Sequence, residues 1–362
     1  MKITFFLGGL SGGGTERVVC NLSSYLAGKG HSVEILTMAD DAPSYYLSPS
    51  VNRVPLIRQN ERRSFIFNSI LRIKRLKTYM KTASTDRYVV MLPTTIVLML
   101  LMHRYAGAPI IVSERADPSR ISGVKQFLLK RLVKYASGFV FQTEDACKWY
   151  KPYIQNAKVK VIPNAVNGEF IRNDLQTVQR GKKIAAVGRF TDQKNFELLI
   201  NAFARVHTDH PDYELFLYGD GPKRERYMQL ADSLNLTDHI HMPGYVNNIG
   251  TELSDAALFV LSSDFEGIPN SLMEAMALGI PCVSTDCPVG GPRSLINSGD
   301  NGILVPAGSV EDMANAMLFV INDPENAQEL GRNAKKIIEN LNPEKIYRQW
   351  ELFICGQSLS NK

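Results

Sequence analysis

Two patterns of apolar and polar positions alternate along the chain. Short continuous apolar runs, typical of strands buried on both faces, are followed by segments whose apolar residues recur at helical spacing. The runs that predict strands cover residues 2–7, 31–38, 88–92, 109–113, 138–142, 158–163, 184–187, 214–218, 256–261 and 301–305. Helices are predicted after residue 14, over 64–81, 95–102, 196–206, 270–278 and 343–353, and from 143 and 310 onward. This alternation indicates an α/β fold with parallel sheets covered by helices.

The length of the chain predicts two domains rather than one. A chain of 362 residues exceeds what one ordinary core holds. The polar segment 173–183 is predicted to be a linker, which gives an N-terminal domain over 1–172 and a second domain over 173–343. Residues 40–55 are predicted to be a polar connection without a strand.

The segment 256–278 predicts a buried strand, a loop and a helix. The loop holds Glu266, Gly267 and Pro269, and the helix is expected to begin with Asn270 and Ser271 as capping side chains. Free backbone amides at such a helix start bind phosphate. Glu266 and Glu274 bracket the start, with seven residues between them. Taken alone, they also fit a solvated loop acid and an ordinary helix surface residue.

The stretch EGIPNSLME, Glu266 to Glu274, resembles the E-x7-E motif of the retaining GT-B glycosyltransferases of family 4. The resemblance covers nearly the whole chain and is strongest over 184–296. It implies two Rossmann-like domains that face each other across a cleft, with the C-terminal helix region 344–362 packing back on the first domain. It also implies that Glu266 lies against the donor sugar and that Glu274 holds the ribose hydroxyls, a task that suits an acceptor-only carboxylate.

A second loop in the same half carries two cations, Arg189 and Lys194, after the strand at 184–187. Arginine binds two oxygens of a diphosphate and lysine adds a point charge, although each alone also fits a surface cation. Their placement matches the pyrophosphate-binding pair of the family, so they join Glu266 as the expected catalytic residues. The other donor-binding residues implied by the resemblance are Gly13, Gly14, Gly188, Gly244, Val246, Gly267, Ile268, Asn270, Ser271, Leu272 and Glu274.

The N-terminal half supplies the expected acceptor site. Its glycine loop at residues 8–14 lets backbone approach a phosphate or sugar, and by itself also fits a loose dinucleotide fingerprint. By resemblance, Glu16 is expected at the acceptor. Many family members carry histidine at the position of Arg115; because arginine cannot act as a base, we expect it to bind a phosphate. Asp117 is a candidate ligand for the acceptor hydroxyl, with a helix cap as the alternative.

Charge separates the two halves. Residues 1–173 hold 25 Lys and Arg against 11 Asp and Glu, a net +14, whereas 174–362 hold 16 against 25, a net −9. A basic half suits nucleic acid, anionic lipid or a phosphorylated acceptor. No nucleic-acid motif with interleaved aromatic residues is present, so we exclude nucleic acid and rank an anionic membrane surface first.

The basic helix predicted over 64–81 is the candidate membrane contact. Its apolar residues form one stripe, and basic residues line an edge of that stripe. The stripe comprises Ile66, Ile70, Ile73, Leu76 and Met80, and the basic residues are Arg72, Lys74, Lys77 and Lys81. A core-facing helix with a solvated basic back is the alternative. Near a charged bilayer each basic residue contributes about 1 kcal/mol.

Other features narrow the class of protein. The five cysteines show no metal-site spacing and indicate reduced thiols in a cytoplasmic protein. The apolar start is predicted to be a strand rather than a signal peptide. No D-x-D motif is present, so no metal or other cofactor is expected, and a chelator should leave activity intact.

Together these observations predict a retaining hexosyltransferase. The expected donor is a nucleotide-diphosphate sugar, with uracil favoured as the base by general resemblance. The expected acceptor is a polyprenyl-diphosphate-linked saccharide at the cytoplasmic face of the cell membrane. Two alternatives remain: a GT-B sugar-nucleotide epimerase, which needs no acceptor, and a non-catalytic membrane-binding protein on a transferase scaffold.

Overall fold

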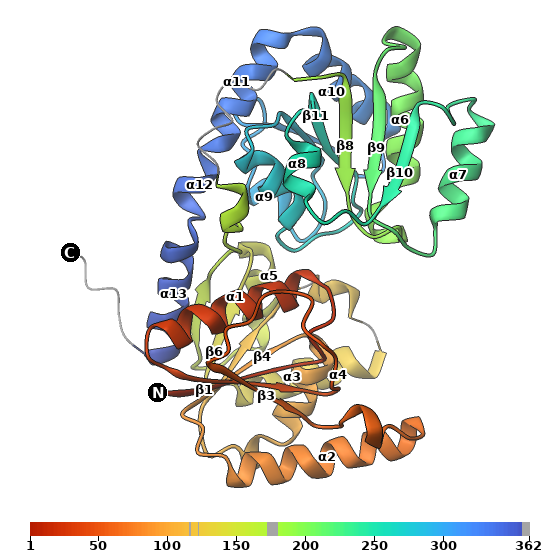
Figure 1. Cartoon of the computed structure of the whole chain (residues 1–362). Coiled ribbons are helices and arrows are strands. Elements are labelled where there is room, and N and C mark those ends of the chain that lie inside the picture. Colours follow the sequence, from red (N-terminus) through yellow and green to blue (C-terminus); the bar gives the residue numbers. More distant parts are fainter. Residues whose placement is uncertain (116, 122, 172–179, 357–362) are drawn as a thin grey trace. The chain divides into compact units, whose positions relative to one another are not determined.

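The computed structural model describes residues 1–115, 117–121, 123–171 and 180–356 (Figure 1). Most of the linker predicted over 173–183 lies outside these ranges. The chain divides into two compact units, which are described separately below. Unit 1 comprises Met1–Ala165 with Glu344–Lys362, and unit 2 comprises Val166–Pro343. The C-terminal helix α13 (Pro343–Cys355) therefore completes the N-terminal unit.

Unit 1 is built on a parallel seven-stranded sheet in the order β3-β2-β1-β4-β5-β6-β7. Its strands are β1 (Lys2–Leu7), β2 (Ser32–Thr37), β3 (Val51–Pro55), β4 (Arg87–Met91), β5 (Ile110–Ser113), β6 (Gly138–Phe141) and β7 (Lys158–Val161). Its helices, besides α13, are α1 (Gly14–Gly28), α2 (Phe65–Thr82), α3 (Pro93–Leu101), α4 (Gly123–Leu132) and α5 (Glu144–Tyr150). Phe5 pairs with Ile35 on one side and Val89 on the other, so β1 is central and buried on both faces.

Strand β3 corrects the prediction of a connection over residues 40–55. Val51–Pro55 pairs in parallel with β2 at the end of the sheet. It was missed because its sequence, VNRVP, is polar and ends in proline, a residue found at edge strands. The strand extends the sheet beside β2 and leaves the central strands in their predicted places.

Unit 2 is built on a six-stranded parallel sheet in the order β10-β9-β8-β11-β12-β13. Its strands are β8 (Lys183–Val187), β9 (Glu214–Tyr218), β10 (Ile240–Gly244), β11 (Leu258–Leu261), β12 (Cys282–Thr285) and β13 (Ile303–Val305). Its helices are α6 (Phe196–Asp209), α7 (Arg224–Ser233), α8 (Ile249–Leu253), α9 (Asn270–Ala277), α10 (Val310–Asn322), α11 (Pro324–Lys335) and α12 (Ile337–Asn340). In chain order this is the 3-2-1-4-5-6 arrangement of the Rossmann fold, so β8 and β11 form the switch point where ligands bind.

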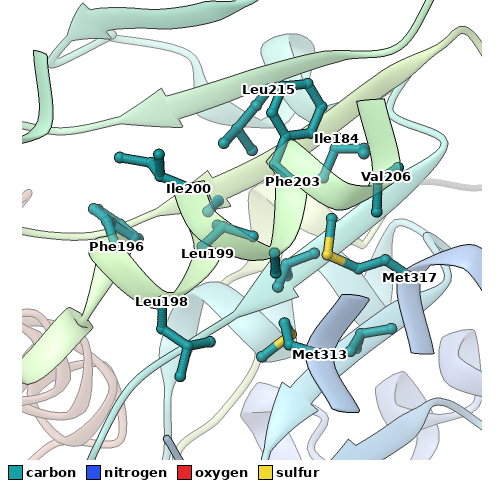
Figure 2. Close-up of a cluster of buried hydrophobic side chains, with 14 of the residues drawn as sticks. Ile184, Phe196, Leu198, Leu199, Ile200, Phe203, Val206, Leu215, Met313 and Met317 are labelled. Atoms are coloured by element: carbon teal, nitrogen blue, oxygen red, sulfur yellow. The ribbon is translucent and has the colours of Figure 1, made fainter. Parts of the chain in front are cut away.

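The core of unit 2 holds α6 and α10 against this sheet. Figure 2 shows Phe203 and Val206 of α6 beside Ile184 of β8 and Leu215 of β9, with Met317 of α10 next to them. Full burial of each such side chain contributes about 1.5–3 kcal/mol. This packing fixes the helix that begins where the Arg189–Lys194 loop ends.

Helix α13 is held on unit 1 by both apolar and polar contacts. Trp350 is buried, and the Arg115 guanidinium lies 5.3 Å from the centroid of its ring. Lys29 Nζ lies 2.9 Å from Glu344 Oε1, and His31 Nε2 lies 3.0 Å from Glu351 Oε1. Chain ends more than 300 positions apart are thus packed into one unit.

Candidate active site

The loops after β8 and β11 are joined by hydrogen bonds at the switch point of unit 2. Asn195 Nδ2 donates to Asp264 Oδ1 (2.8 Å), and the Asp264 amide donates to the Gln193 carbonyl (2.9 Å). Ser262 Oγ donates to the Lys194 carbonyl (2.8 Å). The two loops predicted to bind the donor therefore form one rigid surface at the carboxyl ends of the strands.

Lys194 and Glu266 form an ion pair in this surface. Lys194 Nζ donates to Glu266 Oε1 (2.6 Å), and Ser263 Oγ donates to the same oxygen (2.9 Å). The exposed fractions of the lysine and glutamate side chains are 16% and 9%. Among the described residues, both of these donors bind Oε1, and none donates to Glu266 Oε2. Burying two charges costs solvation free energy, which the attraction between them offsets only when their geometry is good. The pair is therefore expected to hold both side chains in place.

Three glycines bring the backbone close to this pair. A Cβ at Gly188 would lie 2.8 Å from Lys194 Cε, so the lysine stem lies directly over that glycine. A Cβ at Gly219 would lie 2.1 Å from the Gly188 carbonyl oxygen, and one at Gly221 would lie 2.6 Å from that of Phe190. The loop after β9 thus supports the loop that carries Arg189 and Lys194.

The loop after β12, residues 286–291, supports Glu266 from the other side. The Glu266 amide donates to the Pro288 carbonyl (2.6 Å), and the Val289 amide donates to the Glu266 carbonyl (3.0 Å). A Cβ at Gly291 would lie 1.5 Å from the Gly267 carbonyl oxygen, so no larger residue fits without moving the backbone. Cys287 lies in the same loop; burial, and then the Glu266 charge, raise its pKa to about 12. Its thiol stays protonated at neutral pH and is no nucleophile.

Helix α9 begins at Asn270, but its capping differs from the prediction. The N-cap residue is Pro269, and no side chain caps the helix, so Asn270 and Ser271 occupy the first helical positions. Proline has no backbone N–H, so Pro269 itself donates no hydrogen bond. The amides of the first helical residues, from Asn270 onward, still lie at the helix start. Glu274 is buried, which excludes the alternative of an ordinary surface residue. Leu272 and Ile268 are also buried.

The remaining donor residues of unit 2 are more open. The Arg189 side chain is exposed and makes no hydrogen bond or ion pair within the described ranges, as suits a cation that awaits a ligand. Gly244 ends β10, and its carbonyl accepts from the Gly219 amide (2.9 Å). Val246 follows, half-buried, in the next loop. Lys194 and Glu266 contact each other. Within the described ranges neither side chain forms a hydrogen bond with Gly244 or Val246.

In unit 1 the glycine loop leads from β1 into α1. Gly13 is the N-cap residue and Gly14 the first helical residue. A Cβ at Gly13 would lie 2.2 Å from Glu16 Oε2, so the Glu16 carboxylate lies over the helix start, where the helix dipole favours an anion. Glu16 therefore already occupies part of the space that a phosphate at this helix start would use.

Asp117 acts as the cap that the sequence offered as an alternative. Its Oδ1 accepts from the amide (2.9 Å) and the hydroxyl (2.6 Å) of Ser119. Its Oδ2 is buried and has no hydrogen-bond partner among the residues that the structure describes. A free carboxylate oxygen fits the acceptor-hydroxyl role as well, so both uses of this side chain are compatible.

Arg115 has the surroundings of a packing residue. It is 8% exposed, and its Nη1 donates to Asn164 Oδ1 (2.8 Å) while its guanidinium stacks on Trp350. Burial lowers its pKa to about 10. Its Nε and Nη2 are buried without a hydrogen-bond partner among the described residues, and the phosphate contact expected for this position stays a prediction.

Within the described ranges, no group of three or more His, Cys, Asp or Glu side chains is arranged to hold a metal ion. None of the helices there combines the length and apolar character that crossing a bilayer requires.

Comparisons with known proteins show which family the chain resembles. The sequence model of the family described as Glycosyltransferase Family 4 matches residues 12–170, and the sequence model of Glycosyl transferases group 1 matches residues 167–337. The chain is 27% identical to an exopolysaccharide phosphotransferase of Streptomyces coelicolor over 97% of its own length, and it spans 40% of that protein. It is 26% identical to N-acetylgalactosamine-N,N'-diacetylbacillosaminyl-diphospho-undecaprenol 4-alpha-N-acetylgalactosaminyltransferase of Campylobacter jejuni, over 98% of this chain and 100% of that one. Anabaena HepE in complex with UDP-glucose superposes with a TM-score of 0.83 at 18% identity, over 98% of this chain and 100% of that chain.

Two Rossmann-type units and this structural likeness define a GT-B fold. Because the two family models together span both units, the chain belongs to the glycosyltransferases of family 4 and group 1, and it is a hexosyltransferase.

Proposed function

We propose that the chain is a retaining transferase that moves a sugar from a UDP-sugar to a hydroxyl of a polyprenyl-diphosphate-linked saccharide. The observation that best supports the proposed UDP-sugar donor is the buried Lys194–Glu266 pair beside the start of α9. The acceptor half is supported by the Campylobacter relative, whose name describes a diphospho-undecaprenol acceptor. An epimerase would need no such acceptor, so the relatives favour a transferase.

The proposed mechanism assigns each group one task. Arg189, Lys194 and the amides at the start of α9 stabilise negative charge on the departing diphosphate. Glu274 binds the ribose hydroxyls, and Glu266 Oε2 accepts a hydroxyl of the donor sugar. The acceptor oxygen attacks the anomeric carbon on the face from which the diphosphate leaves. The bond from that carbon to the phosphate oxygen breaks, and this oxygen takes the acceptor proton. Asp117 Oδ2 orients the acceptor hydroxyl.

The donor assignment predicts a thermal shift. A ligand that binds only the folded state at about 100 times its Kd stabilises a protein by about 2.7 kcal/mol. We expect UDP-sugars to raise the melting temperature and the isosteric variant Glu274→Gln to lose most of that rise. Folded protein that no nucleotide stabilises would contradict the proposal and favour the non-catalytic scaffold.

The proposed membrane contact is the exposed apolar surface of α2. The stripe predicted there is only partly covered: Leu76 and Met80 are buried, whereas the N-terminal half of the stripe is open. Phe65, Ile66 and Ile70 are 82%, 72% and 62% exposed, and Phe67 and Ile73 are exposed as well. The alternative of a wholly core-facing helix is therefore wrong. Neighbouring exposed apolar side chains of this kind mark an interaction surface.

The basic residues of α2 contribute less free charge than the sequence suggested. Arg72 Nε donates to the Met38 carbonyl (3.0 Å), and Arg75 forms two hydrogen bonds with Glu61, which lower the pKa of that carboxyl to about 2. Lys77 and Lys81 lie over the Tyr105 ring. Lys74 is exposed. We infer that apolar insertion, with lysines at its edge, carries more of the proposed attachment than charge alone.

Helix α4 extends the same surface. Val124 and Phe127 are exposed on it. Aromatic contacts connect the two helices: Lys77 of α2 lies 4.7 Å from the Tyr105 ring, and the neighbouring His103 stacks on Tyr135, just beyond α4, at 3.9 Å. Two helices on one contact surface would orient unit 1 on a bilayer as well as attach it.

The membrane proposal predicts a loss of vesicle binding. The double change Ile66→Ser with Ile70→Ser removes exposed apolar surface without touching the core, so the fold should be unaffected. We expect wild type to sediment with anionic vesicles and the variant to stay largely in solution. Phe319→Ser, at an exposed apolar position of unit 2, is the matched control and should sediment like wild type. Equal sedimentation of all three proteins would rule the contact out.

A further inference from the structure

Arg180, which precedes β8, binds four backbone carbonyl groups at once. Its Nη1 donates to the carbonyls of Ser254 (2.9 Å) and Ala256 (3.4 Å). Its Nη2 donates to the carbonyls of Leu278 (3.0 Å) and Gly279 (2.8 Å). Burial lowers the pKa of this guanidinium from its usual value. A half-buried cation thus joins two segments that are more than 20 positions apart in the chain.

Both segments are helix C-termini. Ser254 is the C-cap residue of α8, and Leu278 is that of α9. Behind Leu278 the chain forms a Schellman motif: the Ile280 amide donates to the Ala275 carbonyl (3.1 Å), and the Gly279 amide donates to that of Met276 (2.9 Å), with φ +68° at Gly279. The motif leaves the last carbonyls unpaired, and Arg180 binds them. A cation here also complements the negative end of the helix dipole.

We propose that Arg180 is a positioning residue for the donor: by holding the C-terminus of α9, it fixes the helix whose first amides and Glu274 meet the nucleotide. The inference rests on the proposed donor site. Helix α9 has eight residues, about 12 Å of helix, so a rigid helix this short carries a shift at its last turn directly to its first. A displacement of about 1 Å in a site of this kind costs up to a hundredfold in rate.

A cavity gives experimental access to this contact. It has a volume of about 960 Å³ and lies at the amino ends of β8, β11 and β12, away from the Lys194–Glu266 pair. Arg180 lines it together with Gly279, Lys335 and Arg332. If the side chain is shortened, a small cation from solution can enter the vacated place. Arg180→Ala is therefore suited to rescue by guanidinium.

The experiment compares donor kinetics of Arg180→Ala with those of wild type. We expect the KM for the donor to rise about tenfold or more, the KM for the acceptor to stay unchanged, and millimolar guanidinium to restore much of the donor KM. Partial unfolding alone would lower kcat and leave both KM values unchanged. Lys183→Ala is the matched control: Lys183 Nζ donates to the Glu252 carbonyl (3.0 Å) and to Asp255 Oδ1 (2.8 Å), near α8 but not α9. Its donor KM should stay at the wild-type value.

A second variant covers the case in which Arg180→Ala does not fold. Arg180→Lys keeps the charge but lacks the planar group that spans both carbonyl pairs, so its donor KM should rise with little loss of stability. A wild-type donor KM in a folded Arg180 variant would overturn the inference. Failure of wild type itself to use or bind any sugar nucleotide would instead contradict the proposed function.

Discussion

Replacing Lys194 with methionine is expected to lower kcat/KM by about a hundredfold or more. Loss of one charged group that stabilises the departing diphosphate costs about 3 kcal/mol in comparable sites. The change also leaves the Glu266 carboxylate, 9% exposed, without its ion-pair partner. Steady-state rates with a UDP-sugar donor measure the effect.

The control for this change is Lys223→Met. Lys223 is a partly buried lysine of the same unit that pairs with Asp192 and Glu197 rather than with Glu266. It should retain near-wild-type rates. If both variants were equally active, Lys194 would have no role in the departure of the leaving group.

Replacing Gly291 with alanine is expected to damage the same site through the backbone. The new Cβ would lie 1.5 Å from the Gly267 carbonyl oxygen and 2.6 Å from its carbon, so the segment that carries Glu266 must move. Overpacking of this kind costs about 1–3 kcal/mol, which lowers the melting temperature by a few degrees to about 10 °C. Thermal unfolding with and without UDP-sugar measures both the stability and the loss of the donor-induced shift.

Gly168→Ala is the control for this change, because it makes the same substitution at a glycine without close neighbours. Gly168 lies in the same unit, and, apart from its two chain neighbours, none of the residues that the structure describes places an atom within 4 Å of a Cβ there, so this variant should melt and bind like wild type. Gly188→Ala provides a graded case, because its Cβ would meet the flexible Lys194 side chain rather than backbone. Unchanged melting of Gly291→Ala would show that the two loops separate easily.

The two strands that carry the Lys194 and Glu266 loops, β8 and β11, were predictable because they are buried apolar runs, whereas β10 and β12 were not predicted. The runs around Leu258–Leu261 and Lys183–Val187 are continuous and apolar, so neither needed knowledge of its neighbours. Strand β3 was not predictable, since an edge strand with polar residues and a proline carries no such signal. The stripe on α2 shows the limit of periodicity: it identifies the residues that share a face but not whether anything covers that face.

Some site residues could likewise be identified from the sequence, whereas their contacts could not. Resemblance selected Lys194 and Glu266, but their contact depends on β8 and β11 being neighbours, which only the strand order reveals. Gly291 lies in a segment, 287–292, that the sequence predicts to be a tight loop near the site, but the sequence does not show which carbonyl this glycine meets. Arg180 fell in the segment predicted to be a polar linker, where a cation is usually solvated. Its partners are carbonyl groups, which carry no side-chain pattern to detect.

The discontinuous make-up of unit 1 affects the order of events on the ribosome. Unit 2 is one unbroken stretch, Val166–Pro343, and can fold once its last strand and helices have emerged. Unit 1 lacks α13, and with it Trp350, until the whole of unit 2 has been synthesised. Arg115 and the apolar surface beneath α13 therefore wait uncovered while nearly 180 further residues are made. Unit 1, whose synthesis begins before that of unit 2, is therefore completed only after unit 2.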